Sequence, residues 1–210
     1  MPDTPVPSPS VFLAQDLRSV LPIGIPLGWQ PQTSATHKSF AVRRGGRNCY
    51  LDEEGQQLWA AAWRGPTRKE LIDVMAALWQ KDRDRVAIDL DRFLAGCLLA
   101  QLGGDWREDW DRIALLRILP RAFVLDSDKQ SRFRLVSADG RWEVWLGGVE
   151  YAVWSFCDGT ADLGAAVREV AKATGLQVDL LKRRSHSLLV AAVRIKAVFL
   201  DQPAPREVPD

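Results

Sequence analysis

The stretch GQQLWAAAWRGPTRKEL, residues 55–71, predicts two helices and the turn that separates them. Its apolar residues follow the i, i+1, i+4, i+5 spacing of a single helix face: Leu58, Trp59, Ala62 and Trp63. Gly65-Pro66 is typical of a helix end. We therefore expect both tryptophans to be buried as core rather than to form a binding surface.

A second helix is predicted to begin directly after this turn. The hydroxyl of Thr67 can accept a hydrogen bond from a free amide of the first turn, and Glu70 completes a capping box. The apolar stripe of this helix consists of Leu71, Ile72, Val74, Met75, Leu78 and Trp79.

The same order of elements occurs twice along the chain. Leu21-Pro22, Trp59 and the helix after Thr67 have counterparts about 95 residues later. Those counterparts are Leu119-Pro120, Trp154 and a helix that Asp162 is expected to cap. A third helix should follow in each copy, capped by Asp89 and by Asp179. In the first copy its apolar face is predicted to hold Phe93, Leu94, Cys97 and Leu98.

Each copy also contains a predicted antiparallel hairpin. FAVRRGGRNCYL (40–51) alternates apolar residues around Gly45-Gly46, and FRLVSADGRWEVWL (133–146) does so around Asp139-Gly140. The alternation divides the last strand into a face with Trp142, Val144 and Leu146 and a face with Arg141, Glu143 and Trp145. Trp145 is predicted to lie on the less buried face.

Composition excludes several classes of function. With 47% apolar and 26% charged residues the chain has an ordinary globular composition, and no apolar run approaches the ~20 residues that cross a bilayer. No membrane partner is therefore expected. A formal net charge of +1 gives no chain-wide field that would attract nucleic acid. Nine tryptophans are many, but in small domains such rings more often fill the core.

The ends and the cysteines indicate a cytoplasmic protein. MPDTPVPSPS has prolines where a signal peptide needs a basic start and an apolar helix, so we interpret it as a disordered tail. Cys49, Cys97 and Cys157 lie far apart without C-x-x-C spacing, which favours buried thiols over disulfides or a zinc site. Neither a metal nor another cofactor is expected.

The repeated order resembles the PqqD family and the wider set of winged-helix-like precursor-peptide recognition elements. That resemblance rests on [I/L/V]-W-x-x-x-x-G followed by a cap residue and an amphipathic helix. Leu58-Trp59 to Thr67 is similar to this motif, and so is Val153-Trp154 to Gly159. Ile88-Asp89 and Val178-Asp179 are similar to the start of the family's last helix. Residues 20–102 and 118–200 are covered.

The resemblance implies an α+β fold with two winged-helix-like units in tandem. Each unit would combine an antiparallel β-hairpin or small sheet with about three helices. Unit one is placed at residues 16–104 and unit two at residues 105–200, between disordered tails at 1–15 and 201–210. WREDWD, residues 106–111, is interpreted as a solvated linker or helix start at the junction.

What the resemblance implies for function is non-catalytic peptide binding. Such a chaperone-like module holds a peptide as an added strand and presents it to a peptide-modifying enzyme. The peptide or partner protein would pair with the strand Asn48 to Leu51 or the strand Arg141 to Leu146. Helix residues 90–101 or 180–187 would contact its other side. The expected contact residues are Asn48, Tyr50, Leu51, Arg141, Glu143, Trp145, Lys182, Arg183 and Arg184. A proline at Val144 should weaken docking if that amide faces the open edge.

Two alternatives remain. RRGGR (43–47) and KRRSHS (182–187) could contact phosphates, so a winged-helix DNA-binding regulator is the second hypothesis and nucleic acid the less favoured partner. An enzyme is not expected, because His37 and His186 have no metal-ligand spacing and no nucleophile or phosphate-loop motif occurs.

Overall fold

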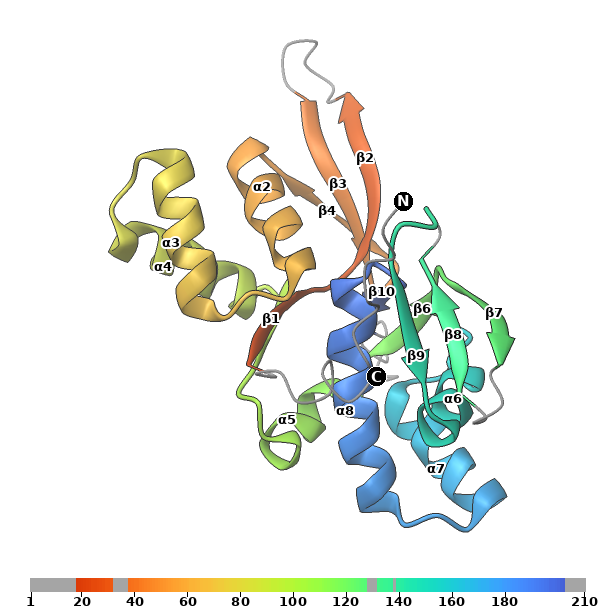
Figure 1. The fold of residues 1–210 in the computed structure, drawn as a ribbon. Helices are drawn as coiled ribbons and strands as arrows, with labels where there is room; N and C mark the ends of the chain where they lie inside the picture. Colours follow the sequence, from red (N-terminus) through yellow and green to blue (C-terminus); the bar gives the residue numbers. More distant parts are fainter. Residues whose placement is uncertain (1–17, 32–37, 128–131, 138, 203–210) are drawn as a thin grey trace, which may run out of the picture.

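The computed structural model describes residues 18–31, 38–127, 132–137 and 139–202 as a mixed α+β fold with small antiparallel sheets (Figure 1). The predicted tail at 1–15 and His37 lie outside the described residues. No helix in the described part of the chain has the length and apolar character needed to cross a membrane.

Unit one begins with four strands and continues with helices. The elements are β1 (Ser19–Pro22), β2 (Ile25–Pro31), β3 (Lys38–Arg44), β4 (Arg47–Leu51), α2 (Glu53–Ala61), the 3-10 helix η1 (Ala62–Arg64), α3 (Arg68–Trp79), α4 (Arg83–Ala95) and β5 (Leu99–Leu102).

The predicted second unit has the same order of strands and α-helices after one extra helix, without a counterpart of η1. The elements are α5 (Trp106–Ile113), β6 (Arg117–Pro120), β7 (Phe123–Ser127), β8 (Phe133–Val136), β9 (Glu143–Leu146), α6 (Gly148–Ser155), α7 (Leu163–Thr174), α8 (Val178–Arg194) and β10 (Val198–Asp201).

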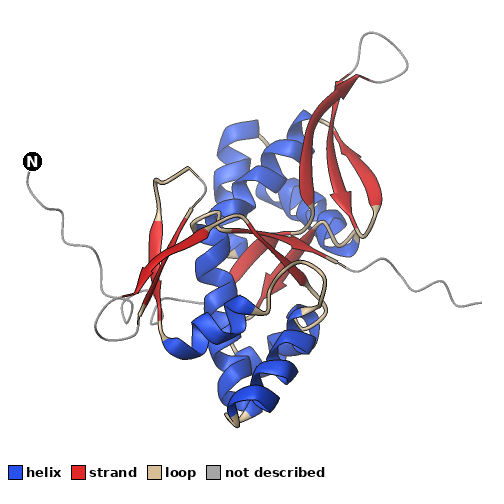
Figure 2. Cartoon of the chain, turned by 90° about the vertical axis from the view of Figure 1, so that its right-hand side faces the viewer, coloured by secondary structure: helices blue, strands red, loops and turns tan. Residues whose placement is uncertain are grey.

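Strand pairing repeats together with the element order. β2-β3-β4 and β7-β8-β9 form three-stranded sheets, whereas β1 pairs with β5 and β6 pairs with β10. The first and last strands of each unit are therefore partners. Corresponding helices begin about 95 residues apart, α2 with α6, α3 with α7 and α4 with α8. Figure 2 shows strands near the middle of the molecule, between the sheet at the upper right and the strands at the left.

The opening stretch folds as its spacing predicts. Trp59 and Trp63 are buried, and their rings meet edge to face with centroids 5.5 Å apart. Gly65 ends η1 at φ 59°, a left-handed conformation that glycine adopts without a steric penalty. Thr67 and Glu70 form both hydrogen bonds of the predicted capping box. Asp162 caps α7 by accepting from the Ala165 amide at 2.6 Å.

The predicted start of the third helix is right in unit two and wrong in unit one. α8 begins at Val178, although Gln177 rather than Asp179 is its N-cap residue. α4 begins at Arg83, so Asp89 lies in its middle. Its buried face consists of Val86 and Leu90, with Phe93 and Leu94 packed beside them. Cys97 and Leu98 lie beyond the helix end.

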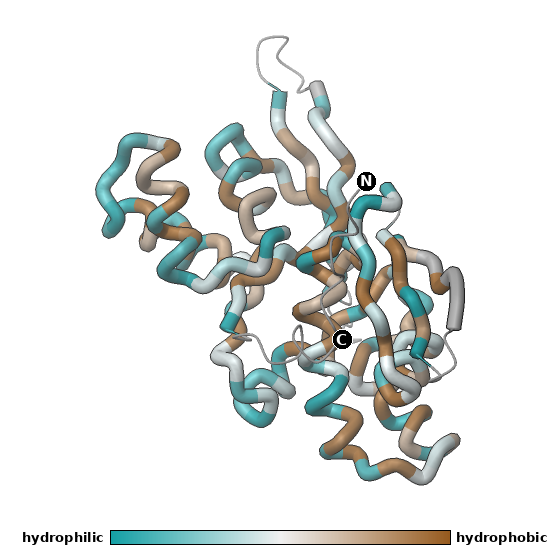
Figure 3. The backbone as a smooth tube through the Cα atoms, in the orientation of Figure 1, coloured by the Kyte–Doolittle hydropathy of each residue, from teal (hydrophilic) through white to brown (hydrophobic). Residues whose placement is uncertain are grey.

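The two units share one core. Buried side chains of both belong to a single cluster, and hydrophobic residues dominate the C-terminal half of α8 at its centre (Figure 3). Trp63 of η1 meets Phe199 of β10 edge to face at 5.5 Å. Arg194 of α8 donates to the Ser19 hydroxyl and the Gly65 carbonyl. β10 includes Asp201, one residue into the segment predicted as a tail.

Candidate functional site

The open edges of the two larger sheets are β4 and β9 on one side and β2 and β7 on the other. β2 contains Pro26 and Pro31, and its register shifts between Pro26 and Gly28. β7 has the matching shift between Val124 and Asp126. Bulges and prolines protect edge strands from pairing with further chains. β4 and β9 have neither, so both units leave the corresponding edge regular.

On β4 the outward backbone groups belong to Asn48 and Tyr50. Gly45 and Gly46 both have positive φ and close a two-residue turn between Arg44 and Arg47. The Arg47 amide therefore points toward β3, and the direction alternates along the strand. The amides of Asn48 and Tyr50 point away from the sheet, and both side chains are exposed.

On β9 the outward groups belong to Glu143 and Trp145. Ser137 donates its amide to the Trp142 carbonyl at 2.9 Å, which makes these two residues a hydrogen-bonded pair. Backbone hydrogen-bond direction alternates along the strand. The amide and carbonyl of Val144 therefore point toward β8, and those of Glu143 and Trp145 point toward the open edge. Among the described residues, no backbone hydrogen bond reaches the outward amides of either edge.

The Val144 amide does not meet the condition set for the proline test, and two predicted contact residues, Leu51 and Arg141, do not supply outward backbone groups of β4 or β9. Val144 does not face the open edge, so a proline there would break the ladder with β8. Leu51 is buried, and its amide points toward β3. Arg141 precedes β9, and its amide donates to Asp139 at 3.2 Å. The Ser137 hydroxyl and then this amide hold the pKa of Asp139 below its ordinary value.

Trp145 lies on the less buried face of β9, as predicted. Val144 and Leu146 point into the core, and Phe133, the cross-strand partner of Leu146, stacks on Tyr151. On the opposite face Arg132 lies over the Trp145 ring, 5.6 Å from its centroid.

Each last helix connects to the residues around an open edge strand. In Figure 1, α8 lies on the side of β9 away from β8. Arg184 of α8 forms an ion pair of 3.1 Å with Glu150, in the first turn of the helix that follows β9. In unit one a Cβ on Gly55 would lie 3.0 Å from the Phe93 ring of α4 and 3.4 Å from Leu51. The ion pair therefore joins α8 to the helix that follows β9, and in unit one Phe93 of α4 lies near Leu51 of β4.

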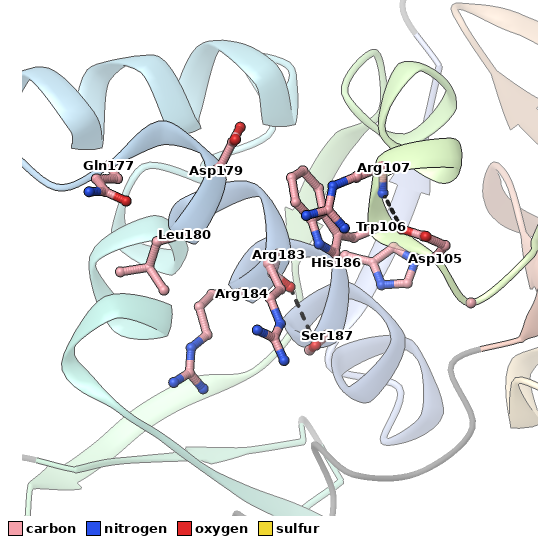
Figure 4. A pocket seen from close by; sticks show the side chains of 11 residues that line it. Asp105, Trp106, Arg107, Gln177, Asp179, Leu180, Arg183, Arg184, His186 and Ser187 are labelled. Carbon is pink, nitrogen blue, oxygen red and sulfur yellow. Dashed lines mark hydrogen bonds between the residues drawn. The ribbon is translucent and has the colours of Figure 1, made fainter.

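The basic residues predicted on α8 separate in space. Lys182 pairs with Asp179 and lies over the Trp110 ring of α5. Arg183 and Arg184 are exposed on the outward face, together with Leu180. An open pocket of about 810 Å³ lies along this face, between α8 and the start of α5 (Figure 4). Arg183 and Arg184 therefore line this pocket, whereas Lys182 lies against Trp110 of α5.

The predicted basic hairpin tip is docked onto unit two. The Gly45 amide donates to Asp201 at 2.8 Å, and Arg44 donates to Gln202 at 3.0 Å. Asp201 also pairs with Arg117 at 3.0 Å. Within RRGGR, Arg43 and Arg47 remain more exposed than Arg44.

A buried polar cluster was missed in the sequence. Asp109 of α5 accepts from the Gly103 amide through Oδ1 at 2.8 Å and from the Gly104 amide through Oδ2 at 3.1 Å, and His186 Nε2 lies 2.9 Å from the same Oδ2. Because a carboxylate only accepts, Nε2 carries the proton. Asp109 and His186 are 1% and 0% exposed, so the pair cannot meet a substrate without a conformational change. The interpretation of 106–111 as a solvated linker is therefore wrong, whereas its helix start is confirmed.

Cys157 should be the least reactive thiol. Burial, with the charge of Asp158 as a second cause, raises the pKa of Cys157 to about 12. Cys49 and Cys97 are partly exposed. At pH 8 we expect a thiol-specific chromogenic reagent to modify those two quickly and Cys157 only after unfolding. Since the folded pKa is raised, this thiol should stabilise the fold below about pH 9 and lose that effect as the pH rises toward 12. Equal reaction rates at all three sites would contradict this.

Comparison with protein-family models, with curated proteins and with solved structures finds no match to this chain. Function is therefore inferred from geometry and chemistry.

Proposed function

We propose that this protein is a non-catalytic, cytoplasmic peptide-binding protein that adds a peptide as a further strand to a sheet edge. A peptide held in this way would be presented to a partner such as a peptide-modifying enzyme, as the resemblance to PqqD-like modules implies. The supporting observation is the unprotected, regular edge that recurs at β4 and β9.

Backbone pairing is the source of affinity in this proposal. An added strand forms main-chain hydrogen bonds with outward amides and carbonyls, and side-chain contacts give selectivity. Asn48 and Tyr50 supply such groups on β4, and Glu143 and Trp145 supply them on β9. Bulges protect the edges at β2 and β7. A peptide can therefore pair with the regular edges at β4 and β9.

The DNA-binding alternative receives less support from the same contacts. A wing hairpin must be free to reach the duplex, whereas the β3–β4 tip packs on Asp201 and Gln202. A recognition helix needs its polar face exposed. Ser185 and His186 of the KRRSHS segment are buried, which leaves Arg183 and Arg184 as its exposed cations.

An edge proline tests the proposal. We expect Glu143→Pro to weaken the binding of edge-bound peptides about ten-fold or more, because it removes an outward N–H and places a ring at the edge. The probe is a random twelve-residue phage-displayed library selected on the full chain, followed by fluorescence anisotropy with synthetic copies of the selected peptides.

Glu143→Ala is the matched control, since it also removes the 3.7 Å ion pair with Arg134 but keeps the amide. Asn48→Pro applies the same test to β4. The proposal is wrong if selected peptides bind both proline variants and the wild type equally while the thermal transition is unchanged. Tight, salt-sensitive binding of duplex DNA without any peptide binding would favour the regulator instead.

A further inference from the structure

The two last helices present different chemistry beside equivalent edges. Positions i, i+3, i+4 and i+7 share one helix face. On α8 the outward face carries Leu180, Arg183, Arg184 and Ser187. With α4 and α8 aligned at their first residues, the corresponding residues of α4 are Arg85, Ile88, Asp89 and Arg92. Where unit two has two adjacent arginines, unit one therefore has an isoleucine and an aspartate.

We infer that the β9 edge takes a peptide strand with acidic side chains, which Arg183 and Arg184 bind from α8. This inference rests on the proposed function and names the class of peptide. In Figure 4 the guanidinium groups of Arg183 and Arg184 extend to the same side of α8, whereas Asp179 points the other way. Both arginines also line the open pocket, whose other wall is formed by residues 104–107 at the start of α5.

The charges around this face are unevenly paired. Asp179 pairs with Lys182, and Arg184 pairs with Glu150. In the described part of the chain, no carboxylate lies within ion-pair distance of the Arg183 guanidinium, which is exposed. An arginine fork can bind a carboxylate through two parallel hydrogen bonds. Arg183 is thus available to a peptide carboxylate without breaking a contact of the fold.

Arg184 fixes the position of the site relative to the edge. Its partner Glu150 is 6% exposed and follows β9 by four residues, so the ion pair holds α8 against α6, the helix that follows that strand. Its own side chain stays 45% exposed, which leaves donors for an incoming anion. Arg107, at the start of α5, lines the far side of the pocket and stacks over Trp106 at 4.7 Å.

The edge strand and the outward face of α8 together define a peptide by chemistry. Its backbone would pair with Glu143 and Trp145, and the side chains turned toward α8 would include Asp or Glu. Unit one has Ile88 and Asp89 at the positions of α4 that correspond to this pair of arginines, so the β4 edge should show no such preference.

The experiment compares charge variants with one another. Peptides selected on the wild-type chain should be enriched in Asp and Glu, and Arg183→Ile should weaken their binding about ten-fold or more. Peptides with Asp→Asn and Glu→Gln changes should bind wild type and Arg183→Ile alike. Arg183→Glu should restore binding to peptides that carry Lys at the acidic positions. Arg184 is left unchanged, because its loss would strand buried Glu150.

Arg85→Ile is the control, since it removes an exposed arginine from the corresponding face of α4. It should not alter the acidic preference. The inference is overturned if edge-bound peptides show no enrichment in acidic residues, or if Arg183→Ile binds acidic and neutral peptides as the wild type does. Failure of the proposed function looks different, because then no peptide would bind in a way that Glu143→Pro or Asn48→Pro disrupts. Binding of duplex DNA through Arg183, with no peptide selected, would overturn both.

Discussion

Replacing Trp59 with Ala should lower the free energy of unfolding by about 3–5 kcal/mol, as large core truncations do. Trp59 is 2% exposed and packs between Phe40 and Trp63. Its indole N–H donates to the Ile23 carbonyl at 3.1 Å, so truncation also leaves a buried acceptor without its partner.

Urea unfolding followed by circular dichroism measures this loss. Trp142→Ala is the matched control, because Trp142 is 57% exposed and its truncation should change stability by no more than about 0.5 kcal/mol. If Trp59→Ala kept the wild-type transition but abolished peptide binding, the tryptophan pair would be a binding surface after all.

Local signals predicted the elements whose ends are fixed by neighbouring residues. Thr67 with Glu70 and Asp162 marked two helix starts, and Gly45-Gly46 marked a hairpin turn. These contacts span three residues or fewer, so they can be recognised without tertiary information. The two corresponding tryptophans, Trp59 and Trp154, are both buried, which is consistent with the repeated order of elements.

Signals that depend on distant partners were missed. In unit one Cys97 and Leu98 were assigned to the third helix, yet left-handed Cys97 lies beyond the end of that helix and β5 follows. Left-handed Lys196 likewise lies between α8 and β10, and neither closing strand was predicted. Their partners β1 and β6 lie at the other end of each unit. Asp89 was predicted to cap the third helix from its correspondence with Asp179, but the buried Val86 already belongs to that helix, which begins at Arg83.

The sequence predicted which strand holds the candidate site, but not which backbone amides of that strand face outward. Alternation assigned Glu143 and Trp145 to one face, but the direction of each amide depends on register with β8, which the sequence does not specify. For the same reason Val144 was the wrong place for a proline. The separation of Lys182 from Arg183 and Arg184 depends on α5, which had been interpreted mainly as a linker.

Removing Asp109 should be as costly as removing Trp59. Asp109→Ala would leave His186 and the amides of Gly103 and Gly104 without their acceptor in a buried site. Breaking a buried polar pair in this way costs about 3–5 kcal/mol. The cluster joins residues 103–109, between the two units, to α8. Its loss should therefore also weaken the packing of α8, which carries Arg183 of the proposed peptide site.

Three variants separate a structural role from a functional one. Asp109→Asn keeps one acceptor oxygen and should lose less stability than Asp109→Ala, whereas Asp111→Ala, exposed on the same helix, should be neutral within about 0.5 kcal/mol. Denaturant midpoints measure all three. Full stability of Asp109→Ala, together with loss of binding or of a chemical activity, would identify the Asp109–His186 pair as a functional centre that opens to solvent. The burial of both side chains predicts the opposite: stability falls first, and any effect on peptide binding follows from it.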